Sequence, residues 1–596
     1  MSNERAFLGV ERSLGGRRWR SRLDDDRLAL TLAQVRDLPE PLARVLAARG
    51  VAVDEIDSYL APSLRQMMPD PSCLKDMDAA AGRLAQAVRD GELIALFGDY
   101  DVDGATASAM LRLFLESVGG RVRPYIPDRL REGYGPNAPA LSLLAGEGAS
   151  VVVTLDCGIS AHEPLAKATA DGMAVIIADH HLAGPSLPTA HAVVNPNRLD
   201  DLSGLDMLAA VGVAFMLAIA TNRVLRDSGW YTMRNEPDLR QWLDLVALGT
   251  ICDMVPLVGL NRALVRRGLD VMRRRGNVGL ATLADVAGVD RSPDTYLAGF
   301  VLGPRINAGG RVGQADLGHR LLTSGNAAAV LPLARALEQH NKERKAIEHT
   351  VTDAALREAQ ALADRAALVV AGEGWHGGVI GLAASRLADR YGRPALVIGF
   401  DGDEGKGSAR SLPGIDIGTI VTAACQADLL QAGGGHPMAA GFTVARERLG
   451  AFRSFVEARV AAQAKMVGGP SLGLDGAMMV GAASRDLIAM LAEAGPYGAG
   501  NPEPRFVFPG CQIAHAAVVG SEHVRCRLVG ESGGSLSAIA FGTASQPVGE
   551  ALLAAQGRPL HVAGHLRENR WRDRVEVQMV IDDVANVAAA MTEQAA

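Results

Sequence analysis

The segment 93–115, LIALFGDYDVDGATASAMLRLFL, constrains the fold of this chain more than any other stretch. It opens with an apolar run typical of a buried strand, places Asp99, Asp101 and Asp103 within five residues, and turns at Gly104 into an Ala-rich helical pattern. Alternate residues of an extended segment point to the same side, so the three carboxylates repel one another unless a cation lies between them. The segment therefore predicts a metal site at the end of a strand, with a solvated acidic turn as the simpler alternative.

Two later apolar runs, ASVVVTLDCGIS and AVIIADHH, end in the same kinds of side chain. Their polar end residues are Asp156 in the first run and Asp179, His180 and His181 in the second. Apolar strands that alternate with helical patterns predict a parallel α/β sheet, in which ligands bind beyond the carboxyl ends of the strands. We therefore expect these residues to converge on one crevice, together with Asp253, which follows the apolar stretch of DLVALGTICDMVPL.

The predicted crevice gathers six aspartates and two histidines. Carboxylates with a minority of imidazoles suit Mn²⁺ or Mg²⁺ better than structural zinc, which draws on cysteines. The six cysteines of the chain are scattered without a C-x-x-C pair, which indicates reduced thiols. Because these ligands exceed what one ion needs, we expect two ions that share a carboxylate, an arrangement that supports phosphoester hydrolysis. The residues alone thus predict a two-metal phosphohydrolase.

Glycine-rich segments later in the chain contain candidate phosphate-binding side chains. LGPRINAGGRVG carries two arginines among four glycines, and glycines let a backbone approach a phosphate that arginines can clamp. GSARSLPGIDI and QAGGGHPMAAGF are similar in kind. The candidates are Arg305, Asn307, Arg311, Ser408, Arg410 and His436. Taken one at a time, each segment fits a tight structural turn equally well.

The length and the changes of pattern predict several domains. A chain of 596 residues exceeds what one hydrophobic core covers. Strand–helix repeats resume after a long helical stretch and give way, past Pro470, to short alternating strands separated by glycine. We expect a helical cover of the first α/β domain at 1–90, that α/β domain at 91–325, a connecting helix at 326–365, a second α/β domain at 366–465 and an OB-like β-barrel at 470–590.

The barrel is a candidate single-strand binding module, because small barrels beside catalytic domains often stack bases on aromatic side chains. Aromatic residues make up only 4% of the chain, and the candidates in the barrel are Phe506, Phe508, Phe541 and Trp571. The net charge of −7 does not indicate a nucleic-acid binder, although a local basic channel is compatible with it. No apolar run is long enough to span a membrane and the N-terminus is rich in Arg and Asp, so we expect a cytoplasmic protein.

GDYDVDG, LDCG, ADHH and TICDMVPL, in this order, resemble the four motifs of the DHH phosphoesterase superfamily. GWHGGVIGLAASRL together with GGGHPMAAGF resembles the DHHA1 domain that follows it in that superfamily. With the long joining helix and the C-terminal barrel, the resemblance covers about residues 70 to 590 and is strongest to the superfamily's single-stranded-DNA-specific 5′-to-3′ exonucleases. It implies an enzyme of DNA repair and recombination that releases 5′-mononucleotides by two-metal hydrolysis.

The resemblance also implies roles for individual residues. The implied metal ligands are Asp101, Asp103, Asp156, His180 and Asp253, with Asp99 and His181 at or beside the cluster. The implied catalytic residues are His181, as the group that protonates or stabilises the leaving oxygen, Arg305 at the scissile phosphate and Asp179 as an orienting residue. The implied substrate-binding residues are Arg129, Asn307, Arg311, Ser408, Arg410 and His436. Many superfamily members have a histidine upstream of the first aspartates where Phe97 and Gly98 stand here, so direct coordination by Asp99 stays open.

The implied partners are single-stranded DNA, a helicase and a single-strand-binding protein, with no membrane partner. Two alternatives remain at this point. One is a small-substrate member of the superfamily that hydrolyses pyrophosphate, a cyclic dinucleotide or very short oligonucleotides, although such a substrate needs neither a barrel nor a two-domain clamp. The other is a catalytically inactive scaffold, although every motif carboxylate and both histidines are present.

Overall fold

The computed structural model describes residues 5–129, 131–362, 364–464, 469–555, 557–571 and 574–587. These residues divide into two units, each with its own packing. One unit comprises Pro69–Val255 and Leu264–Gly468, within the described residues, and contains both α/β domains. The other comprises the described residues up to Met68, the short segment Pro256–Ala263 and the described residues from Gly469 onward.

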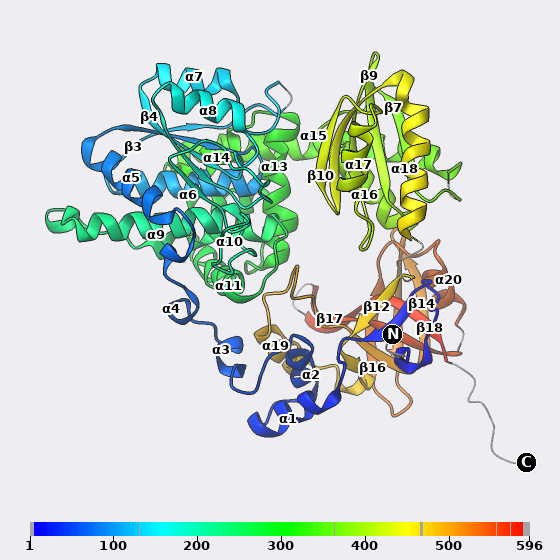
Figure 1. The fold of residues 1–596 in the computed structure, drawn as a ribbon. Helices are drawn as coiled ribbons and strands as arrows, with labels where there is room; N and C mark the ends of the chain where they lie inside the picture. The colour runs from blue at the N-terminus through cyan, green and yellow to red at the C-terminus, as the bar shows by residue number, and fades with distance from the viewer. Residues whose placement is uncertain are drawn as a thin grey trace, which may run out of the picture. The chain divides into compact units, whose positions relative to one another are not determined.

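The apolar runs that end in aspartate form the first α/β sheet, whose five strands are all parallel and lie in the order β3-β2-β4-β5-β6 (Figure 1). The strands are β2 (Leu93–Gly98), β3 (Arg121–Tyr125), β4 (Ala149–Leu155), β5 (Ala174–Ala178) and β6 (Ala192–Val194). Phe97, Val152 and Ile177 point to one face and pack against α7 and α8, while α5, α6 and α9 contact the sheet on the other. Helices on both faces explain why the strands read as continuous apolar runs.

Some helices of this domain connect successive strands of the sheet, and the others precede its first strand or follow its last one. They are η2 (Pro71–Cys73), α5 (Met77–Asp90), α6 (Val102–Ser117), α7 (Ala138–Gly146), α8 (His162–Ala170), α9 (Ala210–Asp227), η3 (Trp230–Thr232), η4 (Leu239–Trp242), α10 (Leu243–Cys252), α11 (Gly259–Arg273), α12 (Val278–Val286), the π-helical turn η5 (Leu297–Leu302), α13 (Gly303–Val312) and α14 (Leu317–Thr323). A helix of 34 residues, α15 (Ala327–Gln360), follows them.

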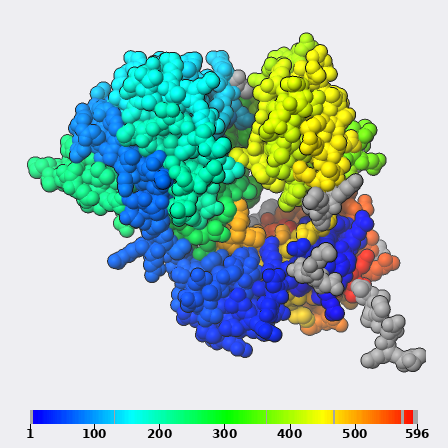
Figure 2. All heavy atoms as spheres, in the orientation of Figure 1, coloured from blue at the N-terminus to red at the C-terminus, as the bar shows by residue number. Residues whose placement is uncertain are grey.

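The second α/β domain is a five-stranded mixed sheet in the order β10-β11-β9-β8-β7. Its elements are β7 (Leu368–Glu373), α16 (Ile380–Tyr391), β8 (Ala395–Asp401), β9 (Glu404–Arg410), α17 (Ile417–Gln426), β10 (Ala432–His436), β11 (Ala439–Ala445), η6 (Arg446–Arg448) and α18 (Leu449–Ala464). Alternate residues of β8 pack against α15 and α16 on one face and against α17 and α18 on the other. Figure 2 shows α18, in yellow, at the outer surface of this domain, while β10 is an exposed edge strand.

The C-terminal region folds into a closed five-stranded barrel, in which β14 pairs with β15, β15 with β16, β16 with β18, β18 with β17, and β17 again with β14. Its elements are β12 (Ser471–Leu474), β13 (Gly476–Ala477), η7 (Val480–Ala482), α19 (Arg485–Glu493), β14 (Phe506–Val519), β15 (His523–Val529), β16 (Ser535–Ala540), α20 (Pro547–Ala554), β17 (Pro559–Trp571) and β18 (Arg574–Asn586). The predicted fold class, two α/β domains joined by a long helix and followed by a barrel, is confirmed.

Of the helical cover expected at 1–90, α5 contacts the first α/β domain, whereas the described residues up to Met68 fold with the C-terminal region. The elements up to Met68 are η1 (Phe7–Gly9), β1 (Arg18–Ser21), α1 (Asp26–Arg36), α2 (Glu40–Ala48), α3 (Ile56–Leu60) and α4 (Leu64–Met67). Leu32 and Leu46 share a core with Phe506 and Phe508 of the barrel, and β1 pairs in parallel with β12. An amphipathic helix pattern requires an apolar partner but does not specify which one.

The same core corrects part of the base-stacking prediction. Phe506 and Phe508 are fully buried, so their rings are unavailable to a nucleic acid. Phe541 is exposed, and the side chain of Trp571 lies outside the described residues. Among the described helices, none is both long enough and apolar enough to cross a membrane.

Candidate metal centre and phosphate site

Three aspartates directly follow parallel strands of the first sheet. The first residue after β2 is Asp99, the first after β4 is Asp156 and the first after β5 is Asp179. The backbone N–H of each donates to a carbonyl of the neighbouring strand at 3.1 to 3.2 Å, which continues the ladder by one bond. The strand pairing itself therefore sets the spacing of these side chains at the carboxyl edge of the sheet.

A tight turn between β2 and α6 places the Asp101 carboxylate at the same edge of the sheet. Asp101 is the N-cap of α6, and its carboxylate accepts a 3.1 Å hydrogen bond from the backbone N–H of Gly104. A Cβ atom on residue 104 would lie 2.6 Å from the backbone nitrogen of Asp99, so only glycine fits this turn. The acidic motif is thus a strand end and a helix start joined by a close backbone approach.

Asp103 and Asp253 come from helices. The carboxylate of Asp103 accepts hydrogen bonds from the backbone N–H groups of Ala210 (2.6 Å) and Val211 (3.0 Å), at the start of α9. Asp253 caps the C-terminal end of α10. Each carboxylate oxygen of Asp103 has a second lone pair, so these hydrogen bonds orient the group and leave it able to bind a cation.

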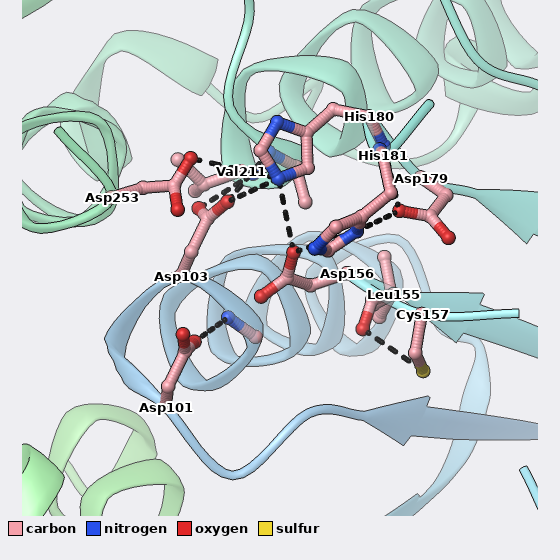
Figure 3. Close-up of polar contacts among 12 residues, drawn as sticks. Asp101, Asp103, Leu155, Asp156, Cys157, Asp179, His180, His181, Val211 and Asp253 are labelled. Atoms are coloured by element: carbon pink, nitrogen blue, oxygen red, sulfur yellow. Dashed lines mark hydrogen bonds and ion pairs between the residues drawn. The ribbon is translucent and has the colours of Figure 1, made fainter. Parts of the chain in front are cut away.

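His180 joins these carboxylates (Figure 3). Its Nε2 lies 3.3 Å from Asp156 Oδ1, 3.5 Å from Asp253 Oδ2 and 4.0 Å from Asp103 Oδ2. Burial and the neighbouring His181 lower the pKa of His180 to about 4, so its imidazole is neutral near pH 7. A neutral imidazole offers a lone pair to a metal ion.

His181 makes a different contact. Its Nδ1–H donates to Asp179 Oδ1 at 2.7 Å, and Asp179 also accepts from the backbone N–H groups of Ile159, His180 and His181. Burial alone would raise the pKa of Asp179, but these bonds and the adjacent histidines bring it to about 2. Asp179 is therefore an ionised carboxylate whose oxygens are already occupied.

Four buried atoms of the cluster have no hydrogen-bond partner within the described part of the chain: Asp99 Oδ1, Asp156 Oδ1, His180 Nε2 and Asp253 Oδ2. Leaving a buried polar atom unpaired costs about 1–3 kcal/mol, so their convergence requires another partner. Burial and the neighbouring carboxylates raise the pKa of Asp156 well above its usual range and that of Asp103 to about 7. A cation bound among them would supply the missing partner.

The ligand atoms gather in three overlapping groups, within each of which all atoms lie within 4.8 Å of one another. These groups are Asp99, Asp101 and Asp156; Asp103, His180 and Asp253; and Asp156, His180 and His181. Carboxylate oxygens with a few imidazoles fit Mn²⁺ or Mg²⁺. Because the groups share Asp156 and His180, the same residues can serve two neighbouring ions.

A basic group lies beside this cluster and includes residues of both α/β domains. Arg311 of α13 is half-buried and donates from Nη1 to the backbone oxygen of Gly378 at 3.0 Å. Burial and the nearby positive charges of Arg129, Arg344 and Arg410 lower the pKa of Arg311 to about 10. The guanidinium is still protonated at neutral pH, so this concentration of positive charge favours an anionic ligand.

The second domain adds a helix N-terminus and a hydroxyl to this basic group. Arg410 donates from Nη1 to Ser408 Oγ at 3.0 Å, and a Cβ atom on Gly381, in the first turn of α16, would lie within 3.0 Å of both side chains. His436 stacks on His181 with ring centroids 5.9 Å apart. The second domain thus brings candidate phosphate-binding groups next to the candidate metal-ligand cluster.

The glycine-rich segment around Arg305 is a helix, α13, rather than the phosphate-binding loop that the pattern suggested. A Cβ atom on Gly310 would lie 2.9 Å from the backbone oxygen of Tyr100, so this glycine allows α13 to pack on the acidic loop. Arg305 donates from Nε to Glu338 of α15 at 2.6 Å and from Nη1 to the Val301 carbonyl. Asn307 is half-buried on the same helix, one turn before Arg311.

Sequence reasoning missed two residues that border the site. The hydroxyl of Tyr134 donates to the backbone oxygen of Asp156 at 3.0 Å, and its ring meets His181 edge-on at 5.9 Å. Gly133 and Gly135 on either side have positive φ, and this Gly-Tyr-Gly pattern was the available signal. Glu338 lies in the predicted connecting helix, where nothing in the sequence distinguished it from the other charged residues of that helix.

Comparison with known proteins identifies three families along the chain. The DHH family, N-terminal domain, matches residues 93–250, the DHHA1 domain matches 364–462, and the RecJ OB domain matches 474–583.

Curated relatives and solved structures extend these matches to most of the chain. The chain is 35% identical to the single-stranded-DNA-specific exonuclease RecJ of Dickeya dadantii over 568 residues, which are 91% of this chain and 96% of that protein. It is 34% identical to RecJ of Bacillus subtilis over 578 residues, 95% of this chain and 71% of that protein. The crystal structure of Thermus thermophilus RecJ in complex with Mn²⁺ superposes with a TM-score of 0.78 at 30% identity, covering 94% of this chain and 78% of that one. The corresponding Mg²⁺ complex gives a TM-score of 0.74 at 29% identity, covering 95% and 78%.

Proposed function

The chain belongs to the RecJ family of single-stranded-DNA-specific exonucleases, and from this premise we propose how its residues carry out metal-dependent 5′-to-3′ hydrolysis of single-stranded DNA. The observation that carries the proposal is the set of four buried, unpaired ligand atoms that converge at the carboxyl edge of the first sheet. Structural ion pairs have no need for such atoms, whereas a metal-dependent hydrolase requires them.

Two Mn²⁺ or Mg²⁺ ions fit the donor set. We assign one site to Asp99, Asp101 and Asp156 and the neighbouring site to Asp103, His180 and Asp253, with Asp156 between them. Metal ions held by these residues would supply the Lewis acidity that activates a water molecule and stabilises charge on the scissile phosphate. Direct coordination by Asp99 is supported by its unpaired, buried Oδ1.

We assign leaving-group chemistry to His181. Its Nδ1–H is held by Asp179, which leaves Nε2 to carry a proton toward the substrate. Burial lowers the pKa of His181, but the hydrogen bond and charge of Asp179 outweigh it and the net pKa is raised. Hydrolysis breaks the bond between phosphorus and the 3′ oxygen of the terminal nucleotide, and the proton from His181 goes to that oxygen. The products are a 5′-mononucleotide and a strand with a new 5′-phosphate.

The 5′-phosphate pocket is assigned to Arg129, Arg311, Ser408, Arg410 and His436. A pocket that needs a terminal phosphate sets the 5′-to-3′ direction, because every cycle regenerates that phosphate. The several positive charges that lower the pKa of Arg311, and the first turn of α16 beside Ser408, support this assignment. A single strand enters such a pocket end first, which a blunt duplex cannot do.

Arg305 and Asn307 are assigned to the wall of α13 that faces the substrate phosphates. The ion pair between Arg305 and Glu338 holds the arginine before substrate arrives, so its contribution is to position α13 as well as to supply charge. In the barrel, Phe541 is exposed and the Arg567 guanidinium lies 4.9 Å from its ring centroid, which supports a role in holding the trailing strand.

The proposed substrate also implies partners. A helicase supplies single strands with free 5′ ends, and a single-strand-binding protein occupies the same DNA, so both act beside this enzyme during repair and recombination. We propose that this work takes place in the cytoplasm.

The test is degradation of a 3′-labelled, 5′-phosphorylated single strand with Mn²⁺, with Mg²⁺ and with a chelator, beside the same strand in a blunt duplex. We expect progressive shortening of the single strand alone, dependent on metal and abolished by Asp156→Ala. Tight binding without cleavage under every condition would contradict the enzyme assignment, and activity confined to pyrophosphate or dinucleotides would indicate a small-substrate hydrolase.

A further inference from the structure

The fourth strand end at the metal-binding edge of the first sheet carries an amide. The first residues after β2, β4 and β5 are aspartates, whereas the first residue after β6 is Asn195. Because β6 pairs in parallel with β5, Asn195 lies at the same carboxyl edge, and its side chain is fully buried. An ionised carboxylate only accepts hydrogen bonds, while an amide also has a nitrogen that donates. This strand end therefore adds a buried donor beside the candidate metal centre.

Two asparagines use such donors on the backbone of the two histidines. The Nδ2 of Asn195 donates to the carbonyl oxygen of His181 at 2.9 Å. The Nδ2 of Asn197 donates to the carbonyl oxygen of His180 at 2.6 Å. The direction of a carbonyl follows the ψ angle of its residue, so each amide fixes the backbone from which one imidazole projects. The two rings reach the cluster side by side, with their centroids 4.7 Å apart (Figure 3).

The turn that carries the two asparagines is itself held firmly. Asn195 Oδ1 accepts a hydrogen bond from the backbone N–H of Asn197 at 2.7 Å, which is an Asx-turn. Arg198, the next residue, is buried and donates to the carbonyl of Val193 at 2.6 Å and to the carboxylate of Asp76 at 2.7 Å. The two amides are therefore fixed donors.

The chain that follows this turn contacts the same cluster twice more. The His180 imidazole donates a hydrogen bond to the backbone of Leu208. Since Nε2 of this ring has no hydrogen-bond partner within the described residues, the bond is made by Nδ1, and Nε2 faces the carboxylates. The backbone N–H groups of Ala210 and Val211 donate to Asp103. The segment between β6 and α9 thus contacts both histidines and one carboxylate of the cluster.

We propose that Asn195 and Asn197 are positioning residues, one for each histidine, an inference that rests on the exonuclease function proposed for the metal centre. Asn197 orients His180, whose Nε2 is assigned to a metal ion. Asn195 orients His181, whose proton is assigned to the leaving oxygen. The two amides belong to one turn but serve different parts of the reaction. Loss of Asn197 weakens metal binding, and loss of Asn195 slows departure of the leaving group.

The first test is calorimetric titration of the full-length protein with Mn²⁺. Asn197→Ala should raise the Kd for Mn²⁺ about 10- to 100-fold, the range for losing an outer partner of a metal ligand. Asn195→Ala should change this Kd less than about threefold, because it acts on the other histidine. Asn277→Ala is the matched control, since Asn277 also donates from Nδ2 to a backbone carbonyl, that of Leu322, at 3.0 Å. An unchanged Kd in Asn197→Ala, or an equal loss in the Asn195 and Asn197 variants, overturns the proposal.

The second test compares two leaving atoms at saturating Mn²⁺. In a strand with sulfur in place of the bridging 3′ oxygen, hydrolysis breaks the P–S bond and the sulfur leaves as a thiolate, which needs no proton because thiols are far more acidic than alcohols. Asn195→Ala should lower kcat roughly 10- to 100-fold on the ordinary strand, a partial loss of what a general acid contributes, and much less on the sulfur strand. Asn197→Ala and Asn277→Ala should leave the ratio of the two rates unchanged. An unchanged ratio in Asn195→Ala overturns the proposal.

Neither readout is mimicked by partial unfolding. The ratio of two rates does not depend on the folded fraction, and the stoichiometry of the titration reports that fraction. Asn195→Ser and Asn197→Ser, which keep a small polar group in the turn, replace any alanine variant that does not fold. Failure of the unsubstituted protein to shorten either strand would contradict the exonuclease function instead, while the Mn²⁺ titration would still decide the role of Asn197.

Discussion

Asp179 accepts hydrogen bonds on both carboxylate oxygens, whereas Asp99, Asp156 and Asp253 each keep a buried oxygen unpaired. This difference separates two roles within one acidic cluster. A carboxylate whose oxygens are occupied orients a neighbouring imidazole, and one with a free lone pair can coordinate an ion. The family resemblance implied an orienting role for Asp179, and the physical basis of that distinction is the set of hydrogen bonds each carboxylate accepts.

Replacing Asp179 with asparagine should separate orientation from metal binding. The amide keeps the size of the side chain but removes the charge that supports a protonated His181. We expect kcat to fall about 10- to 100-fold, with Mn²⁺ affinity nearly unchanged. Calorimetric Mn²⁺ titration and a pH–rate profile check this, with Asp156→Asn as the matched variant that should lose metal. Equal loss of Mn²⁺ binding in both variants would show that Asp179 is a ligand.

The carboxylates proposed as metal ligands also predict how metal affinity depends on pH. Burial and neighbouring carboxylates raise the pKa of Asp103 to about 7 and that of Asp253 to about 9 when no cation is present. Below these pKa values the groups hold protons that an ion must displace. Mn²⁺ affinity should therefore weaken as pH falls from about 9 to about 6, by up to roughly tenfold per pH unit for each proton released. Calorimetry in buffers of different ionisation enthalpy measures that proton release, and pH-independent affinity would contradict the prediction.

At the scale of elements, α15 connects the two α/β domains through packing at both of its ends. Val330 and Leu337 are buried in its N-terminal half, which contacts α12, α13 and α14. Val351 and Ala355 belong to the core of the second domain. The Arg305–Glu338 ion pair adds a polar contact with α13. Because each end of α15 packs into a different domain, the helix fixes the second domain relative to the first. The basic residues of the second domain are therefore held beside the metal centre.

A proline in the exposed middle of α15 should uncouple the two domains. Ala346→Pro removes one backbone hydrogen bond and clashes with the preceding turn, at a cost of about 3 kcal/mol or more, without touching either core. We expect Mn²⁺ binding to persist while kcat/KM on single-stranded DNA falls at least about tenfold, because the residues of the second domain that we propose to bind the 5′-phosphate would no longer be held beside the metal centre. Ala346→Ser is the control. Unchanged kcat/KM would show that the second domain is held without α15.

The glycine-rich segment from Leu302 to Gly313 shows where an element assignment from sequence fails. Four glycines suggested a phosphate loop, yet α13 is helical because Gly310 allows it to pack on the carbonyl of Tyr100. Glycine lowers helix propensity, but tertiary packing overrides that preference. The strands were easier to predict, since each has a continuous apolar run closed by a polar residue.

At the scale of the whole molecule, the N-terminal segment folds with the C-terminal barrel. Asp475 is completely buried and accepts hydrogen bonds from Arg22 and Arg49 as well as from the backbone N–H of Arg505. Asp583, also buried, accepts from the Trp19 indole. These two carboxylates bind residues more than 400 positions away, so the barrel unit includes both parts of the chain.

Asp475→Ala should destabilise this unit strongly. The substitution leaves two largely buried arginines without their carboxylate, and breaking such a pair costs about 3–5 kcal/mol. We expect an earlier first transition in thermal or urea unfolding of the full chain. Asp24→Ala, at an exposed carboxylate of the same unit, should have little effect. A melting curve for Asp475→Ala that matches that of the parent protein would contradict this account.

The sequence by itself determined the parallel strands, the aspartates at their ends, the two histidines, the connecting helix and the barrel, because these depend on local patterns of apolar and polar residues. Tertiary structure alone decided which core the N-terminal helices join, which aspartates keep free lone pairs, that Arg305 pairs with Glu338, and that Tyr134 borders His181. The physical reason is the same in each case. A pattern shows that a face must be covered or a charge compensated, while the partner is chosen by packing between residues far apart in the chain.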